Sequence, residues 1–267
     1  MSFENLDLYK YFGINKNTLG GILNFRLHSD NISRNNMLVI AGGAYEFLCF
    51  RENKPIANRF YENGYNVFYL DYSCGKGVEY LTALKETVMA ISYIREKYNG
   101  KLGIIGFSAG GHLVGQVSND DIDAGFLGER KKYFIKPDAV IYCYPVISAR
   151  KDLIHEDSFR NLLKSKYDEY IESVSVEKMI NGKSSPAFIF HCADDALVPV
   201  GNSLALATAY KENGVPFELH IFPKGGHGVA LPTEECWTKA EILEYGVDSK
   251  MIIWFDLCIK WLENYLK

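Results

Sequence analysis

The chain has 267 residues, of which 48% are hydrophobic and 23% are charged, a composition typical of a globular protein with a sizeable core. Its formal net charge of −4 gives no basic footprint for nucleic acid or for an anionic membrane surface. The sequence contains no uninterrupted apolar span long enough for a bilayer, and its first residues lack the pattern of a signal peptide. The six scattered cysteines have no metal-ligand spacing and are typical of buried thiols in a reducing compartment, so we expect a cytoplasmic protein without a metal.

Short apolar runs alternate with longer helical patterns along the chain, which is typical of βαβ units around a parallel sheet. Neither a repeat nor a Gly/Pro/Ser-rich linker interrupts this pattern, so we expect one α/β domain spanning residues 1–267. The expected strands are residues 37–40, 65–72, 101–107, 137–144, 187–192 and 217–222. The expected helices are residues 55–63, 79–98, one that opens at 108–113, 201–213 and 251–266. The prediction is a mostly parallel central sheet flanked by helices.

One connection in this pattern is unusually long. Residues 147–186, rich in Lys, Asp, Glu and Ser, separate two of the expected strands. A connection of that length is uncommon unless it is functional or carries its own helices. Because residues 158–170 have a helical pattern, we expect a small helical cap inserted over the sheet edge.

A candidate nucleophile lies between an expected strand and an expected helix. Residues 106–110 read Gly-Phe-Ser-Ala-Gly, a G-x-S-x-G sequence in the strand–turn–helix context that gives this motif meaning. The sharp turn lifts the Ser108 hydroxyl above the carboxyl edge of the sheet. It also leaves the Ala109 N–H at a helix N-terminus, where an oxyanion would form. The alternative interpretation is a glycine-rich turn with a bystander serine.

A serine nucleophile needs a base, and the base needs an acid that orients it. In this motif's fold the chain order is Ser, then Asp or Glu, then His. Asp194 and Asp195 both follow a strand, and we favour Asp195 because Val198-Pro199 then leaves a short turn before the next helix. His227 lies in a glycine-rich loop after the last strand, which allows it to return over Ser108.

The other five histidines have plainer interpretations. We expect His112 to be a packed, hydrogen-bonded residue one turn beyond the nucleophile, and His191 to be buried beneath the site. His28, His155 and His220 have no surrounding cluster in the sequence.

The loop at residues 41–45 follows the early strand at 37–40. Its glycines permit close backbone approach, so the N–H of Gly43 or of Ala44 is expected to complete an oxyanion hole with Ala109. The alternative is a tight turn with no catalytic part.

These motifs together resemble the α/β-hydrolase esterases related to acetyl xylan esterases and other carbohydrate or small-ester deacetylases. The resemblance implies the α/β-hydrolase fold, an acyl-enzyme mechanism that needs no cofactor, and a small-molecule ester substrate with a short acyl group, such as an acetylated xylo-oligosaccharide. By analogy it also suggests a homo-oligomer. Such relatives commonly have a third glycine where this chain has Ala44, which leaves the choice between Gly43 and Ala44 open. The segments that carry the resemblance are the loop ending in Tyr45, Arg51-Glu52, Pro55-Ile56-Ala57, Gly64-Tyr65, Leu70-Asp71-Tyr72-Ser73, residues 106–113, Asp195 with Val198-Pro199, and Gly225-Gly226-His227-Gly228.

Two other kinds of function remain compatible with the sequence. A peptidase or lipase uses the same scaffold, although the insert at 147–186 is more polar than a lipase lid. A non-catalytic binder of small ligands would usually have a broken triad, whereas all three members are present here.

Overall fold

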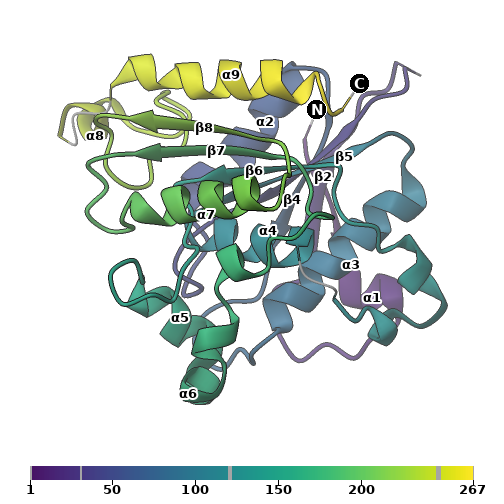
Figure 1. Ribbon diagram of the computed structural model, residues 1–267. Coiled ribbons are helices and arrows are strands. Elements are labelled where there is room, and N and C mark those ends of the chain that lie inside the picture. Colours follow the sequence, from purple (N-terminus) through teal and green to yellow (C-terminus); the bar gives the residue numbers. More distant parts are fainter. Residues whose placement is uncertain (1, 31, 120–121, 245–247, 267) are drawn as a thin grey trace.

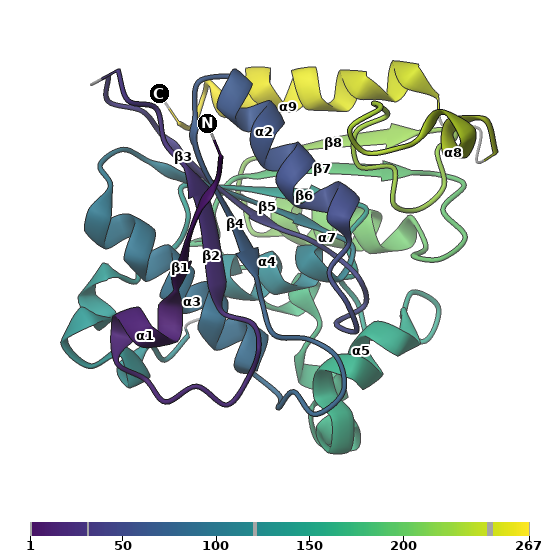
Figure 2. The ribbon, with the colours of Figure 1, turned by 180° about the vertical axis from the view of Figure 1, so that it is seen from behind.

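One mixed sheet runs through the computed structural model, which describes residues 2–30, 32–119, 122–244 and 248–266. Within these residues the sheet has eight strands in the order β1-β2-β4-β3-β5-β6-β7-β8 (Figures 1 and 2). The strands from β4 to β8 in this order are all parallel, and β2 pairs antiparallel with both β1 and β4. The sheet confirms the predicted mostly parallel fold. The strands are β1 (Glu4–Asp7), β2 (Ile22–Arg26), β3 (Asn36–Ile40), β4 (Asn66–Asp71), β5 (Leu102–Phe107), β6 (Ala139–Cys143), β7 (Ala187–Cys192) and β8 (Phe217–Phe222).

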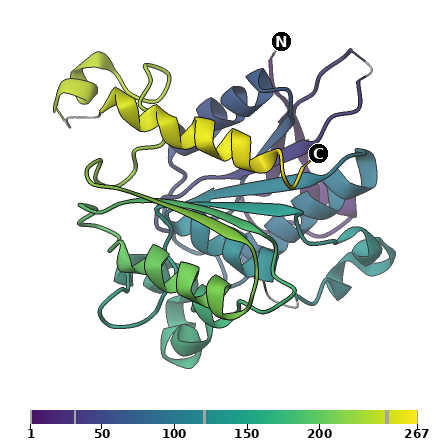
Figure 3. The same cartoon turned by 45° about the horizontal axis from the view of Figure 1, so that its top comes forward.

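Helices cover both faces of the sheet. Helices α2 and α9 lie on one face, and α1, α3, α4 and α7 lie on the other (Figures 1 and 2). Figure 3 shows α9 in yellow and α7 in green on opposite sides of the last strands. The described helices are α1 (Leu8–Phe12), α2 (Lys54–Glu62), α3 (Thr82–Lys97), α4 (Ala109–Asn119), α5 (Glu156–Leu163), α6 (Tyr167–Tyr170), α7 (Gly201–Glu212), α8 (Lys239–Glu244) and α9 (Ile253–Leu262).

The central strands are buried along their whole length. Every residue of β3, β5, β6 and β7 is buried, because helices cover both faces there. This explains why the sequence shows continuous apolar runs for these strands rather than an alternating pattern. Since parallel strands all end at the same edge, the loops that follow β3, β5, β7 and β8 meet at the carboxyl edge of the sheet.

The structure differs from the sequence-based expectation at the N-terminus and in the bounds of two helices. The antiparallel strands β1 and β2 were not predicted. Helix α3 begins at Thr82 rather than at residue 79, because Leu81 has a left-handed backbone with φ of 71°. At the C-terminus α9 occupies Ile253–Leu262, after a 3-10 turn at Ser249–Ile252, so the expected helix at 251–266 was too long.

The insertion between β6 and β7 carries α5 and α6, with a short 3-10 turn between them and two more after α6. In Figures 1 and 2 these two helices lie together, below the sheet. None of the helices in the described part of the chain is both long and apolar enough to cross a membrane.

Candidate active site

Ser108 occupies a strained turn between β5 and α4. Its φ is +50°, in the left-handed region that is costly for a residue with a side chain. Two glycines make the turn possible: a Cβ on Gly106 would lie 2.3 Å from the carbonyl oxygen of Gly110, and a Cβ on Gly110 would lie 2.4 Å from that of Ile40. The Ser108 N–H is anchored on the carbonyl of Cys143, 3.0 Å away. The turn therefore holds the hydroxyl in one place at the sheet edge.

The structure brings Ser108, His227 and Asp195 into one line of hydrogen bonds. Ser108 Oγ lies 2.9 Å from His227 Nε2, and His227 Nδ1 lies 2.7 Å from Asp195 Oδ2. A carboxylate only accepts hydrogen bonds, so Nδ1 carries the imidazole proton and Nε2 is left free to accept one from the serine hydroxyl. This is the arrangement in which an imidazole can activate a serine.

Asp195 is held by four donors. Its Oδ1 accepts hydrogen bonds from the backbone N–H of Leu197 (3.0 Å) and of Val198 (2.9 Å), while His191 Nε2 reaches Oδ2 at 3.1 Å beside His227. Burial alone raises the pKa of Asp195, but the hydrogen bonds from His191 and His227, the charge of His227 and the Val198 amide outweigh it and hold that pKa well below its usual value of 3.8. The carboxylate therefore stays charged next to His227.

The neighbouring carboxylate points elsewhere. Asp194 is exposed, and its Oδ1 accepts a hydrogen bond from the N–H of Gly226 at 2.9 Å. This bond fixes the loop that carries His227, but within the described residues Asp194 forms no hydrogen bond with the imidazole. Of the two acids considered from the sequence, the structure places Asp195 on His227.

The loop after β3 presents backbone amides to the site. The N–H of Gly42 donates to the Glu52 carboxylate at 2.8 Å. Those of Gly43, Ala44 and Ala109 donate to no acceptor within the described residues. Gly43 and Ala44 line the same cavity as Ser108, so either amide is available to an oxyanion together with Ala109.

Ala44 also carries a backbone cost. Its φ is +53°, and Tyr45 follows with +57°, both in the left-handed region. The loop thus adopts a turn that a glycine would make more easily.

The hydroxyl of Ser108 opens into a cavity of about 360 Å³. Besides the loop after β3 and His227, its walls include His155 and Asp157 at the start of α5, and Leu197 after β7. The interpretation of His155 as a residue with no cluster around it is therefore wrong. The insertion reaches the site through tertiary packing, which leaves no spacing in the sequence to reveal it.

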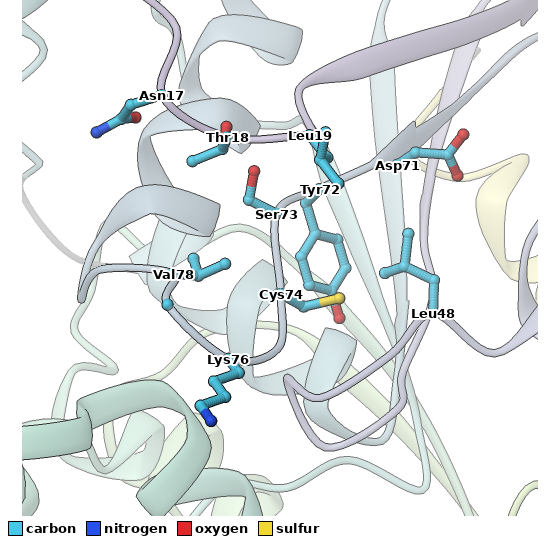
Figure 4. Close-up of a pocket in the computed structure, with 12 residues that line it drawn as sticks. Asn17, Thr18, Leu19, Leu48, Asp71, Tyr72, Ser73, Cys74, Lys76 and Val78 are labelled. Atoms are coloured by element: carbon cyan, nitrogen blue, oxygen red, sulfur yellow. The ribbon is translucent and has the colours of Figure 1, made fainter.

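Another cavity, of about 380 Å³, lies near the loop at 71–78 (Figure 4). It is lined by Tyr72, whose hydroxyl donates to the carbonyl of Ala41 at 2.9 Å, and by Ser73. Among the described residues that line this cavity there is no histidine, and the Ser73 hydroxyl donates to buried Glu86 at 2.6 Å. The cavity next to Ser108 is the one with an activated hydroxyl.

Two other histidines lie where the sequence predicted. His112 is fully buried, with Nε2 2.7 Å from the Val174 carbonyl oxygen and Nδ1 2.9 Å from the Tyr45 hydroxyl. Burial lowers the pKa of His112 to about 4, so it is a neutral structural residue. His191 is also fully buried and lies beneath Asp195.

The comparison with protein families supports the same interpretation. The model of the BD-FAE family matches residues 28–210, which include Ser108 and Asp195. The chain belongs to the BD-FAE family of α/β-hydrolase esterases. The match ends before His227, which the structure nevertheless places against Ser108.

Two curated proteins are similar to the chain. Endo-1,4-beta-xylanase B of Butyrivibrio fibrisolvens is 35% identical over 237 residues, which are 84% of this chain and 37% of that protein. Acetylxylan esterase of Xylanibacter ruminicola is 34% identical over 137 residues, 49% of this chain and 26% of that protein. The chain thus spans well under half the length of these curated relatives.

A solved structure covers nearly the whole chain. The acetyl ester-xyloside bifunctional hydrolase from Caldicellulosiruptor lactoaceticus is 31% identical, with a TM-score of 0.78, over 93% of this chain and 89% of that one. The predicted relationship to acetyl xylan esterases is therefore confirmed.

Proposed function

We propose that this BD-FAE esterase hydrolyses short-chain carboxylic esters through an acyl-enzyme on Ser108. The observation that carries the proposal is the line of hydrogen bonds from Ser108 through His227 to Asp195. His227 Nε2 takes the hydroxyl proton as Ser108 Oγ attacks the ester carbonyl carbon. Asp195 keeps the imidazole in the required tautomer and stabilises the imidazolium that forms.

The negative charge that develops on the carbonyl oxygen needs donors placed in advance. The free N–H of Ala109 and that of Gly43 or Ala44 supply them, each worth about 3 kcal/mol of the barrier. His227 then gives its proton to the leaving alcohol. Water attacks the acyl-enzyme with His227 again as base, which releases the acid and restores Ser108.

We further propose that the natural substrate is an acetylated sugar, such as an acetylated xylo-oligosaccharide. A cavity of about 360 Å³ is at the small end for ligand sites, which suits a short acyl group. His155, Asp157 and Arg51 supply polar groups along its wall, where the hydroxyls of an alcohol moiety need hydrogen-bond partners. The names of the similar xylanase, acetylxylan esterase and acetyl ester-xyloside hydrolase agree with this class.

The test compares hydrolysis of p-nitrophenyl acetate, p-nitrophenyl butyrate and acetylated xylo-oligosaccharide by the wild type and by Ser108→Ala. A matched control is Ser92→Ala, which removes a buried hydroxyl that donates to the Val88 carbonyl of its own helix, 2.8 Å away. We expect acetate to be preferred, acetate to be released from the sugar, and activity to be lost only in Ser108→Ala.

The possible results separate the parts of the proposal. Serine-dependent activity on the nitrophenyl esters alone would keep the esterase and refute the sugar. Full activity in Ser108→Ala would refute the assignment of the nucleophile. An absence of activity on every ester would instead favour a non-catalytic binder.

A further inference from the structure

A second carboxylate lies under the site, and the proposed mechanism does not use it. Glu52 ends a 3-10 turn at Phe50–Glu52, just before α2, and its side chain is only 2% exposed. Its Oε2 accepts a hydrogen bond from the N–H of Gly42 at 2.8 Å, and its Oε1 accepts one from the Tyr144 hydroxyl at 2.8 Å. Each oxygen therefore holds a different element at the sheet edge.

The Gly42 contact places this carboxylate beside the nucleophile. A Cβ built on Gly42 would lie 2.8 Å from Glu52 Oε2 and also 2.8 Å from Ser108 Cβ. Gly42 therefore packs against both the Glu52 carboxylate and Ser108, and Glu52 and Ser108 line the same cavity. The next amides along the chain, Gly43 and Ala44, are the candidate oxyanion donors.

The Tyr144 contact extends the connection to the base. The Tyr144 hydroxyl donates to Glu52 and accepts a hydrogen bond from the N–H of Ala230 at 3.0 Å, in the loop that carries His227. Its ring packs edge-on against the imidazole of His227, with centroids 5.1 Å apart. Tyr144 itself is fully buried, and its own N–H donates to the Phe190 carbonyl at 2.7 Å.

We propose that Glu52 is a positioning residue, whose carboxylate holds the oxyanion loop at Gly42 and, through Tyr144, the loop that carries His227. This inference rests on the proposed esterase function of the same site. The two loops come from opposite ends of the chain, after β3 and after β8, and Glu52 with Tyr144 joins them beneath Ser108. The oxyanion amides and the His227 imidazole must keep fixed positions relative to Ser108 while charge develops on the substrate oxygen.

The charge on Glu52 is costly, which argues against a merely incidental role. No Lys or Arg within the described residues forms an ion pair with it, and Arg51 instead pairs with Glu241 at 3.3 Å and stacks on Trp237. Burial raises the pKa of Glu52, although the bond from Tyr144, the charge of His227 and the Gly42 amide partly offset this. A buried carboxylate that accepts from the oxyanion loop at Gly42, and from a Tyr144 hydroxyl that itself contacts the His227 loop, is typical of a site residue.

The test is Glu52→Gln, which keeps the size of the side chain but turns one acceptor into a donor. If the new NH₂ group faces Gly42, that N–H loses its acceptor; if it faces Tyr144, it donates to the hydroxyl, whose own proton then loses the carboxylate as acceptor. We expect kcat for p-nitrophenyl acetate to fall about 10- to 100-fold, because small displacements of catalytic groups cost that much, while KM stays within about twofold.

The matched control is Glu86→Gln. Glu86 is a fully buried carboxylate that accepts hydrogen bonds from the Ser73 N–H (2.6 Å), the Ser73 hydroxyl (2.6 Å) and the Tyr9 hydroxyl (2.8 Å), none of which belongs to the oxyanion loop or to the His227 loop. Burial raises its pKa as it does for Glu52. We expect this variant to lose a similar amount of thermal stability but to retain kcat within about twofold.

Tyr144→Phe keeps the inference testable even if Glu52→Gln fails to fold. It removes the hydroxyl that joins Glu52 to Ala230, and Tyr9→Phe is its counterpart at Glu86. We expect kcat to fall about tenfold in Tyr144→Phe and to be unchanged in Tyr9→Phe. The kcat of the Glu52→Gln/Tyr144→Phe double variant is expected to be no lower than that of Glu52→Gln, since the effects of substituting residues that act as a unit do not add.

The outcomes separate this inference from the proposed function. If the wild type hydrolyses the ester and Ser108→Ala does not, the function stands whatever the Glu52 variants do. Positioning is then overturned by a wild-type kcat in Glu52→Gln or Tyr144→Phe. It is equally overturned by a loss of kcat that Glu86→Gln shows to the same extent.

Discussion

Replacing Asp195 with Asn tests the orientation of the catalytic imidazole. Asn has the shape of Asp, but one of its two terminal atoms is a donor. The amides of Leu197 and Val198 keep the Asn oxygen on their side, so the NH₂ group turns toward His227. His227 Nδ1 must then accept a hydrogen bond, which moves the imidazole proton to Nε2. A protonated Nε2 no longer accepts the proton of Ser108.

The expected loss follows from that change of tautomer. In serine hydrolases the same replacement lowers kcat about 10⁴-fold, equal to about 5 kcal/mol of the barrier. The protein is also expected to lose some stability at neutral pH. The folded-state pKa of Asp195 is lowered, so its contribution is present above the unfolded pKa of about 3.9 and is lost as pH falls through the folded value.

Asp194→Asn is the matched control at the adjacent position. Its oxygen can still accept from the N–H of Gly226, 2.9 Å away in the wild type, so we expect kcat to stay within about twofold. Both variants have the same composition and net charge. The assay is steady-state hydrolysis of p-nitrophenyl acetate at neutral pH, with thermal unfolding of each variant beside it. Equal losses in the two variants, or a larger loss in Asp194→Asn, would refute the assignment of Asp195.

Three further expectations concern single residues. The pKa of His112 is about 4 in the folded state against 6.5 for an unburied imidazole, so the unfolded chain takes up a proton first as pH falls from 6.5 to 4. Urea unfolding is therefore expected to show about 2 kcal/mol less stability at about pH 5 than at neutral pH, and the His112→Gln variant is expected to lose less. Ala44→Gly relieves a left-handed backbone and is expected to raise Tm by about 2 °C, whereas a lower Tm would contradict this. His155→Ala is expected to raise KM about fivefold for an acetylated xylo-oligosaccharide and less for p-nitrophenyl acetate, and equal effects would argue against a contact with the alcohol moiety.

The fold could be predicted where local sequence decides it. The strands β3, β5, β6 and β7 are buried on both faces and therefore appear as apolar runs. The strands β1 and β2 could not be found in this way, because β1 has only exposed and half-buried residues and is held at the sheet edge by pairing with β2. In turn β2 is held by pairing with β4, a partner more than 40 residues away.

The same distinction applies to the site. Ser108 lies in a local motif, and Asp195 and His227 follow strands in a fixed order, so their meeting could be predicted. Arg51-Glu52 belongs to the segments that carry the family resemblance, but the pattern around it does not indicate that the Glu52 carboxylate is buried, and no pattern indicates that His155 lines the cavity. An acidic residue in the stretch Arg51-Glu52-Asn53-Lys54 has the appearance of a solvated charge. In the folded chain the Gly42 N–H and the Tyr144 hydroxyl, both distant in sequence or in another element, hold this carboxylate inward.

Two buried carboxylates flank the catalytic imidazole, and their surroundings drive their pKa values in opposite directions. Asp195 has two backbone amides and two imidazoles as donors, enough to outweigh the cost of burial and to lower its pKa. Glu52 has one amide and one phenol, so burial prevails and its pKa is raised. As pH falls, Glu52 is therefore the first of the two to take up a proton. A protonated Glu52 presents an O–H to one of its two donors, so the link between the oxyanion loop and the His227 loop weakens while Asp195 still holds the imidazole.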